Sequence, residues 1–221
     1  MRSRPPKASM ASRSRLVTGV GLGAGVGLGA GAALLAGALA GYVLGAKGAL
    51  TVDLGIGRRT RVLGPIHVDI AASREVVFDV VAAPYLGKTP RAMAGKLQVL
   101  ERGEDMVLAT HYTEASGMMV VTVETVRFQR PSRISFKLVR GPVPHVVETF
   151  DLQPAGGGGT RLTYSGEIGA DFWRLGEWWT GIVASKWERA VEASLAGVKE
   201  EAERKSKLRR EPRGTAFTPD A

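Results

Sequence analysis

The chain has 221 residues, a formal net charge of +9 and no cysteine. The absence of cysteine excludes disulfides, thiolate metal sites and cysteine nucleophiles. The excess positive charge lies in two tails, residues 1–15 and 204–213, and residues 16–203 sum to zero. A neutral central part without a basic face interleaved with aromatic residues argues against nucleic-acid binding.

The first predicted element is a membrane anchor, which follows a basic tail at residues 1–15. Residues 16–46 carry no charge, and five cations without an acid precede them. A helix rises 1.5 Å per residue, so about 20 residues cross roughly 30 Å of bilayer hydrocarbon. Residues 16–46 are therefore predicted to form one transmembrane helix.

The charges beside this run favour a single-pass protein of the cell membrane with a cytoplasmic N-terminus. The opposite orientation stays open, because residues 47–63 are also cationic. Cleavage after the small residues Ala38 and Ala40 is a second alternative, although the apolar run exceeds the roughly 7 to 15 residues of a secretory signal. The glycine-rich strings of this run follow no strand, so no dinucleotide cofactor, and no other cofactor, is expected.

Residues 47–63 are predicted to be a juxtamembrane linker that contains a strand or a hairpin. Leu50, Val52, Leu54 and Ile56 alternate with polar residues and glycine, which is the period of a strand. The sequence Gly-Arg-Arg at 57–59 is a turn candidate.

A single domain is predicted over residues 64–204, followed by a basic, disordered tail at 205–221. It begins with a strand at 66–70 and a helix at 74–83 capped by Ser73, and a short helical piece at 85–94 is interrupted by Pro90. Six further strands are expected at 96–102, 106–114, 118–129, 134–140, 145–152 and 160–170. Their short connections favour an antiparallel sheet.

A long helix is predicted over residues 172–207. Apolar residues recur at three- and four-residue spacing along one side, namely Trp179, Val183, Trp187, Val191, Leu195, Val198 and Ala202. The opposite side is charged. Such a helix packs its apolar stripe on a sheet and covers one face of it.

This order of elements resembles the α+β helix-grip fold of the START-like, polyketide cyclase and dehydrase (SRPBCC) superfamily, in which a curved antiparallel sheet wraps around a long C-terminal helix. The segment IHVDIAASREVVFDVV at 66–81 looks like the opening strand and helix of that family. The segments FDLQP at 150–154 and GTRLTY at 159–164 look like its last hairpin. The transmembrane helix before the domain departs from the soluble members.

The resemblance implies an apolar cavity between the sheet and the helix, of the kind that takes up lipids, quinones or polyketide-like molecules. The residues expected to line it are His111, Glu124, Glu148, Phe150, Tyr164, Trp179, Val183 and Trp187. For the aromatic members, simple core packing is the alternative, because any sheet packed on a helix needs an apolar inner face.

Glu124 and Glu148 are the most informative of these residues. Each shares strand parity with apolar neighbours and is therefore expected to point inward. A buried carboxylate is costly unless it is paired or protonated, which makes both glutamates candidates to orient a ligand or to transfer protons. The alternative is a structural ion pair with Arg127 or Arg140.

The three histidines, His67, His111 and His145, lie on separate strands, and their spacing predicts no metal site. Catalytic residues are not assigned. The hypothesis preferred is a membrane-anchored module that binds or carries a hydrophobic small molecule, with the bilayer and this ligand as partners. The alternatives are a cyclase or dehydratase enzyme and a domain that docks a protein at the membrane, and convergent buried ionisable groups would favour the enzyme.

Overall fold

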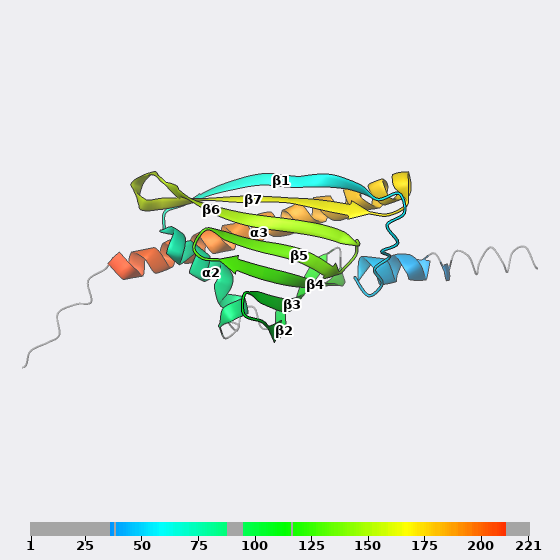
Figure 1. Ribbon diagram of the computed structural model, residues 1–221, viewed down its shortest axis with the longest axis horizontal. Helices are drawn as coiled ribbons and strands as arrows, with labels where there is room; N and C mark the ends of the chain where they lie inside the picture. Colours follow the sequence, from blue (N-terminus) through cyan, green and yellow to red (C-terminus); the bar gives the residue numbers. More distant parts are fainter. Residues whose placement is uncertain (1–35, 38, 88–94, 116, 211–221) are drawn as a thin grey trace, which may run out of the picture. The chain divides into compact units, whose positions relative to one another are not determined.

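The computed structural model describes residues 36–37, 39–87, 95–115 and 117–210. The chain forms two units, Met1–Tyr42 and Val43–Ala221, and the folded domain lies in the second. Its elements follow in this order (Figure 1): β1 Arg59–Ile70, α2 Arg74–Leu86, β2 Leu97–Arg102, β3 Met106–Ala115, β4 Met118–Gln129, β5 Arg133–Arg140, β6 His145–Ala155, the turn η2 Gly156–Gly158, β7 Gly159–Ala170 and α3 Trp173–Arg210.

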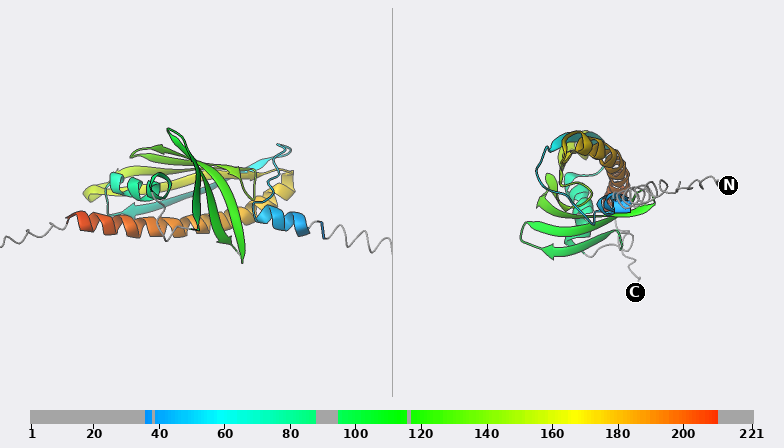
Figure 2. Two further views of the ribbon diagram at one scale, coloured as in Figure 1. Left: turned by 90° about the horizontal axis from the view of Figure 1, so that it is seen from below. Right: turned by 90° about the vertical axis from the view of Figure 1, so that its right-hand side faces the viewer.

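The seven strands form one antiparallel sheet with the order β1-β7-β6-β5-β4-β3-β2. Strands β2 to β7 follow one another as a meander, and β1 joins the edge beside β7. Short turns connect them, as the sequence predicts, because neighbouring antiparallel strands need no crossover. The sheet is curved, and α2 and α3 lie on the same side of it (Figure 2). The predicted helix-grip arrangement is confirmed.

Helix α3 presents the predicted apolar stripe to β1 and β7. Val183, Leu195 and Ala202 are buried, and the tryptophans at 179 and 187 are partly buried against the same core. Helix α2 adds Val77 and Phe78 to this core, which the inner faces of β5, β6 and β7 complete. Burial of this continuous apolar surface is the main stabilising contribution to the domain.

Strand β1 is longer than predicted, because it begins at Arg59 rather than near residue 66. Gly64 and Pro65 interrupt its sequence pattern, and the register with β7 shifts between Leu63 and Ile66. Gly64 has a φ of 73°, which glycine adopts without strain. An edge strand tolerates such a bulge and a proline, since one side of its backbone needs no partner in the sheet.

Helix α2 also extends further than predicted, through Pro84 to Leu86. Tyr85 therefore belongs to α2 and not to a second helical piece, the rest of which, residues 88–94, lies outside the described residues. Ser73 occupies the N-cap position but its side chain makes no capping hydrogen bond. The buried side chain of Tyr85 holds the last turn of α2 against the sheet.

The strand period of residues 50–56 does not produce a strand, because residues 50–55 have no regular secondary structure, whereas residues 59–63 of the predicted linker form the start of β1. Contacts that involve side chains hold this segment instead. The Asp171 carboxylate accepts hydrogen bonds from the amides of Leu54 and Gly55 at 2.6 and 2.9 Å and from Arg58 at 2.8 Å. Thr51 contacts the Gly141 carbonyl at 2.6 Å. These long-range contacts replace the ladder that a strand would need.

The predicted transmembrane run falls largely on residues 16–35 and 38, which lie outside the described residues. Over the part of the chain that the structure does describe, no helix combines the length and the apolar character that a bilayer crossing requires.

The Asp171 contacts generate a test of stability. Asp171→Ala leaves two backbone amides and Arg58 without their shared acceptor, so we expect the free energy of unfolding to fall by about 2 to 4 kcal/mol. Urea unfolding of the full-length protein in mild detergent, followed by circular dichroism, measures this change. The control is Asp53→Ala, which removes an exposed partner of the same arginine. Equal effects of the two variants would contradict the structural role of Asp171.

Candidate functional site

The centre of the candidate site is Glu148, on the inner face of β6. Val146, Phe150 and Leu152 alternate with it along the strand and are buried, so the same pleat turns the Glu148 side chain inward. It is only 6% exposed. Opposite Glu148 on β7 stands Gly166, where a side chain would approach the Val147 carbonyl oxygen to 2.7 Å. Glycine therefore allows the close approach of the two strands at this carboxyl.

Two hydrogen bonds hold the Glu148 carboxyl, and both reach the same oxygen. The Tyr164 hydroxyl on β7 donates to Oε1 at 2.5 Å, and the Trp187 indole on α3 donates to Oε1 at 2.6 Å. Among the described residues, no hydrogen-bond partner meets the other oxygen, Oε2. Glu148 thus joins the sheet to α3 and keeps one oxygen available for a further group.

A second carboxyl, Glu124 on β4, is 5% exposed. Its Oε1 accepts a hydrogen bond from Thr122 at 2.9 Å, and its Oε2 lies 3.1 Å from Nδ1 of His111 on β3. The β4–β5 register shifts between Val123 and Glu124. The extra residue lies on β5, and β4 pairs with β3 without a shift, so the regular pleat of β4 turns Glu124 inward beside Thr122.

His111 connects Glu124 to helix α2. Its Nε2 lies 3.1 Å from the Tyr85 hydroxyl, and the two rings meet edge to face. When Nδ1 carries the proton and donates to Glu124, Nε2 is free to accept the Tyr85 proton. The contacts therefore form a chain from Tyr85 through His111 to Glu124.

The electrostatic environment brings the Glu148 pKa close to neutrality. Burial raises the pKa of Glu148 to about 7, and the nearby charge of Glu124 adds to this rise. The hydrogen bonds from Tyr164 and Trp187 oppose the rise only in part. A carboxyl with a pKa near the ambient pH exists in both protonation states, which suits proton transfer as well as hydrogen bonding.

The other groups of the site also have shifted pKa values. Burial alone would lower the pKa of His111, but the charge and the hydrogen bond of Glu124 outweigh it, and the pKa is raised. Burial is the main reason that the pKa values of Tyr85 and Tyr164 are raised, with the nearby carboxylates adding to it. Both tyrosines therefore remain protonated donors at neutral pH.

Aromatic rings surround these polar groups. The Phe150 ring lies 5.7 Å from Tyr164 and 5.2 Å from Phe136, and Tyr85 contacts Phe136 and Phe128. The site is thus a set of ionisable groups within an apolar wall. This is the composition of a site for a small molecule that has a large apolar part and a few polar groups.

Of the residues predicted from the sequence, the structure brings His111, Glu124, Glu148, Tyr164 and Trp187 together. Phe150 takes part through its ring only, and Val183 is buried on the same face of α3. Trp179 instead donates its indole hydrogen to the Pro142 carbonyl at 2.8 Å, toward the β5–β6 turn. Ligand contact by these residues stays a prediction.

The alternative of arginine partners for the two glutamates is wrong over the residues that the structure describes. Arg127 pairs with Asp105, and the partners of Glu124 and Glu148 are the neutral or ring donors given above. Sequence reasoning missed Tyr85 and Thr122. The parity of Thr122 with Glu124 was a usable signal, whereas Tyr85 depended on the extension of α2 through a proline.

The raised pKa of Glu148 generates a test. Between about pH 5 and about pH 8 the folded protein binds more protons at Glu148 than the unfolded chain, so stability falls as pH rises, by on the order of 3 kcal/mol for this group. The raised pKa of His111 acts in the same direction. We expect Glu148→Gln to show a smaller fall in unfolding free energy, measured by urea unfolding of the full-length protein across this pH range. An unchanged pH dependence in this variant would contradict the shifted pKa.

Several solved structures have a fold similar to that of this chain. The Zhui aromatase/cyclase from Streptomyces sp. R1128 superposes with a TM-score of 0.55 at 17% identity, covering 72% of this chain and 99% of that protein. A protein from Thermus thermophilus gives a TM-score of 0.53 at 20% identity, covering 66% and 99%. Truncated norcoclaurine synthase from Thalictrum flavum gives 0.51 at 16% identity, covering 72% and 99%. At these identities the likeness shows the fold alone.

A search of curated protein sequences finds no match to the chain. A family model described as polyketide cyclase / dehydrase and lipid transport matches residues 66–203, which span the sheet and most of α3. This match covers more than half of the chain, and the resemblance predicted from the sequence is confirmed. The chain belongs to the polyketide cyclase / dehydrase and lipid transport family.

Proposed function

We propose that the domain binds a hydrophobic small molecule, such as a lipid, a quinone or a polyketide-like compound, between the sheet and α3. The observation that carries this proposal is the Glu148 carboxyl. It is buried within an aromatic wall, yet its Oε2 has no partner among the described residues. The only fully buried polar side-chain atom without a hydrogen bond among the described residues is the Thr180 hydroxyl, so Oε2 borders accessible space, where a polar group of a ligand can pair with it.

The ligand therefore has an apolar body and at least one polar group. The apolar body would lie against Phe136 and Phe150, and the polar group would exchange a hydrogen bond with Glu148 Oε2. With a pKa of about 7, Glu148 can donate to a carbonyl when protonated and accept from a hydroxyl when ionised. Tyr164 and Trp187 orient the carboxyl for either bond.

The family and its relatives support a small-molecule ligand. The description of the family includes both cyclase or dehydrase activity and lipid transport. Among proteins of similar fold, norcoclaurine synthase from Thalictrum flavum has been solved with dopamine and hydroxybenzaldehyde.

The proposal includes a membrane tether. Residues 16–46 have the length and the lack of charge of a transmembrane helix, and the basic residues 1–15 favour a cytoplasmic N-terminus. A tether of this kind would keep the domain close to a pool of hydrophobic ligand in the bilayer, so that the ligand need not cross the aqueous phase.

Native mass spectrometry tests ligand binding. The full-length protein, purified from its own source in mild detergent, should retain a stoichiometric hydrophobic molecule, which denaturing extraction identifies. Glu148→Leu removes the hydrogen bond to the ligand, and we expect about tenfold lower retention, the equivalent of one hydrogen bond to a charged group. Glu167→Leu, at an exposed position on β7, is the matched control.

Circular dichroism shows whether Glu148→Leu is folded, and Glu148→Gln, which keeps an acceptor for Tyr164 and Trp187, replaces it if it is not. A clean ligand-free mass of the wild-type protein under several gentle conditions would contradict tight binding.

A second candidate function, an enzyme of the cyclase or dehydratase type, is favoured by the chain from Tyr85 through His111 to Glu124. Glu124 fixes the His111 ring with Nε2 as the acceptor, which is the arrangement of an oriented general base. His111 could then accept a proton next to a substrate carbonyl, while protonated Glu148 donates one to a departing hydroxyl. The products of that step are an alkene and water.

The two candidates predict different contents of the purified protein. An enzyme should yield two bound species that differ by the mass of one water, and His111→Gln should retain only the heavier species because the base is missing. A carrier yields one species in both proteins. The measurement is mass spectrometry of the extracted ligand, with His145→Gln, a partly buried histidine of β6 that pairs with Glu167, as the control. The enzyme hypothesis would be contradicted if the wild-type protein holds a single species and incubation of that species with the protein does not remove water from it.

A further inference from the structure

The turn between β7 and α3 carries an exposed group of large apolar side chains, which we call the aromatic surface. Trp173, Leu175 and Trp178 are 56%, 65% and 59% exposed. The full surface consists of Leu54, Ile56, Phe172, Trp173, Leu175 and Trp178. Exposed apolar groups of this size on a folded domain indicate a surface that contacts another phase or partner.

The two segments that form the aromatic surface lie side by side. The Phe172 amide donates to the Ile56 carbonyl at 2.8 Å, and the Trp173 amide donates to the Gly57 carbonyl at 2.9 Å. Asp171 binds the amides of Leu54 and Gly55 next to this pair. The linker and the start of α3 therefore form one continuous face.

The backbone at this turn is strained. Phe172 and Trp173 have φ values of 74° and 47°, in the left-handed region that aromatic residues rarely adopt. The strain is maintained by the Asp171 contacts and by the packing of Trp173 on Gly57, where a Cβ would lie 2.4 Å from the indole. A strained turn thus carries two aromatic side chains that stay largely exposed, Phe172 at 38% and Trp173 at 56%.

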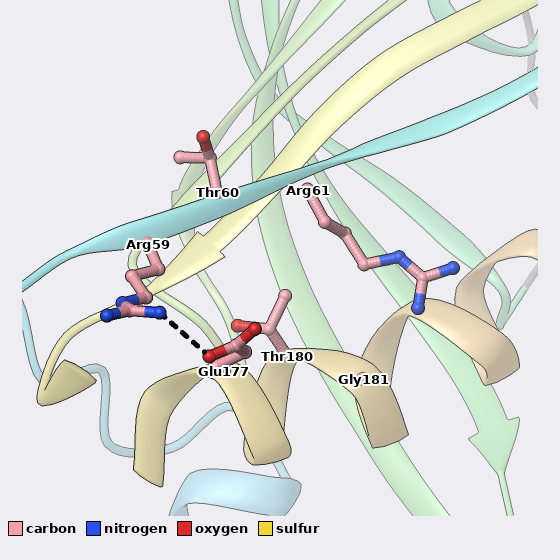
Figure 3. Close-up of a pocket in the computed structure, with 6 residues that line it drawn as sticks. All are labelled: Arg59, Thr60, Arg61, Glu177, Thr180 and Gly181. Atoms are coloured by element: carbon pink, nitrogen blue, oxygen red, sulfur yellow. Dashed lines mark hydrogen bonds and ion pairs between the residues drawn. The ribbon is translucent and has the colours of Figure 1, made fainter. Parts of the chain in front are cut away.

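A groove between β1 and α3 adjoins the aromatic surface (Figure 3). Its volume is about 440 Å³, and Arg59, Arg61, Glu177 and Thr180 line it. Arg59 and Arg61 point from β1 toward α3, and Thr60 points to the opposite side of the strand. The Thr180 hydroxyl is buried and has no hydrogen-bond partner among the described residues.

The groove continues into a second hollow of about 530 Å³, which shares Arg59 and Glu177 and adds Arg174 and Trp178. Three arginines of the combined groove thus meet two carboxylates, because Glu177 pairs with Arg59 at 3.2 Å and Glu188 pairs with Arg61 at 3.6 Å. Guanidinium groups bind phosphate oxygens through paired hydrogen bonds, and the Thr180 hydroxyl can add one more donor. One excess cation, Arg174, remains, and it complements an anionic headgroup.

We propose that the aromatic surface and the groove dock the domain on a phospholipid bilayer, with Trp173 and Trp178 at the headgroup level and a lipid phosphate in the groove. Tryptophan is enriched at this level of membranes because its ring is apolar and its N–H is polar. Arginines next to apolar side chains bind anionic lipid surfaces. The aromatic surface and the groove together supply both kinds of contact.

The path of the chain agrees with this placement. Residues that follow the predicted anchor run along the same end of the sheet: the Lys47 carbonyl accepts from the Val121 amide, Thr51 contacts Gly141, and Asp171 holds Leu54. The docking inference rests on the proposed function only for the tether, since the aromatic surface and the groove belong to the folded domain itself.

Quenching of tryptophan fluorescence by brominated lipids tests the proposal. The full-length protein is reconstituted into vesicles of phosphatidylcholine, with or without an equal part of phosphatidylglycerol, using brominated and plain acyl chains. Because Trp173 and Trp178 are two of the four tryptophans, we expect bromine to remove at least about a third of the fluorescence, and more with phosphatidylglycerol present.

The variants assign this quenching to the surface. Trp173→Phe together with Trp178→Phe should remove most of it, because the two remaining tryptophans, Trp179 and Trp187, are partly buried against the core. Arg59→Gln together with Arg174→Gln should abolish the extra quenching with phosphatidylglycerol. The matched control is Arg204→Gln together with Arg209→Gln, near the other end of α3.

Absent quenching, or quenching that the Trp173 and Trp178 variants leave unchanged, overturns the proposal. If these variants instead alter the oligomeric state in detergent, the surface belongs to a second copy of the chain, which also overturns it. If the Arg59 and Arg174 variant keeps the extra quenching with phosphatidylglycerol, the assignment of the groove to a lipid phosphate is overturned. Ligand retention is measured on the same samples to separate the two proposals. If the protein retains no ligand but its tryptophans are still quenched, ligand binding is contradicted and membrane docking is not.

Discussion

A carboxyl group that is almost completely removed from water is the constraint on which the interior of this domain depends. Glu148 is stable there because Tyr164 and Trp187 donate to it from the neighbouring strand and from α3. These bonds fix the angle and register of α3 on the sheet more specifically than apolar packing can, since hydrogen bonds are directional. The same burial raises its pKa toward neutrality. The burial of Glu148 is therefore the common cause of its directional bonds to α3 and β7 and of its raised pKa.

The second carboxyl makes this interior a coupled system. Glu124 raises the pKa of Glu148 by its charge, both carboxylates raise the pKa of His111, and His111 in turn lowers the pKa of Glu148. Protonation of one group consequently changes the pKa values of the others. A ligand that hydrogen-bonds to Glu148 would therefore change how the neighbouring groups bind protons. A carrier and an enzyme would both use these coupled groups. A carrier would only hydrogen-bond its ligand through them, whereas an enzyme would also transfer a proton to the bound molecule.

The start of α3 links this interior to the surface of the domain. Asp171, just before the helix, binds the linker and holds the strained turn that exposes Phe172 and Trp173. Further along the same helix, Trp187 reaches Glu148. One helix, α3, thus connects the proposed membrane contact to the proposed ligand site.

The sequence by itself determined the order of strands and helices, the apolar stripe of α3 and the inward orientation of Glu124 and Glu148, because periods of 2 and 3.6 residues are local properties. Only the tertiary structure decided the partners of these carboxylates, the inclusion of Tyr85, the irregular course of the linker and the role of Asp171. These features join residues far apart in the chain, through strand register, a bulge and the curvature of the sheet. No short-range pattern encodes such distances, since they are set by the packing of the whole domain.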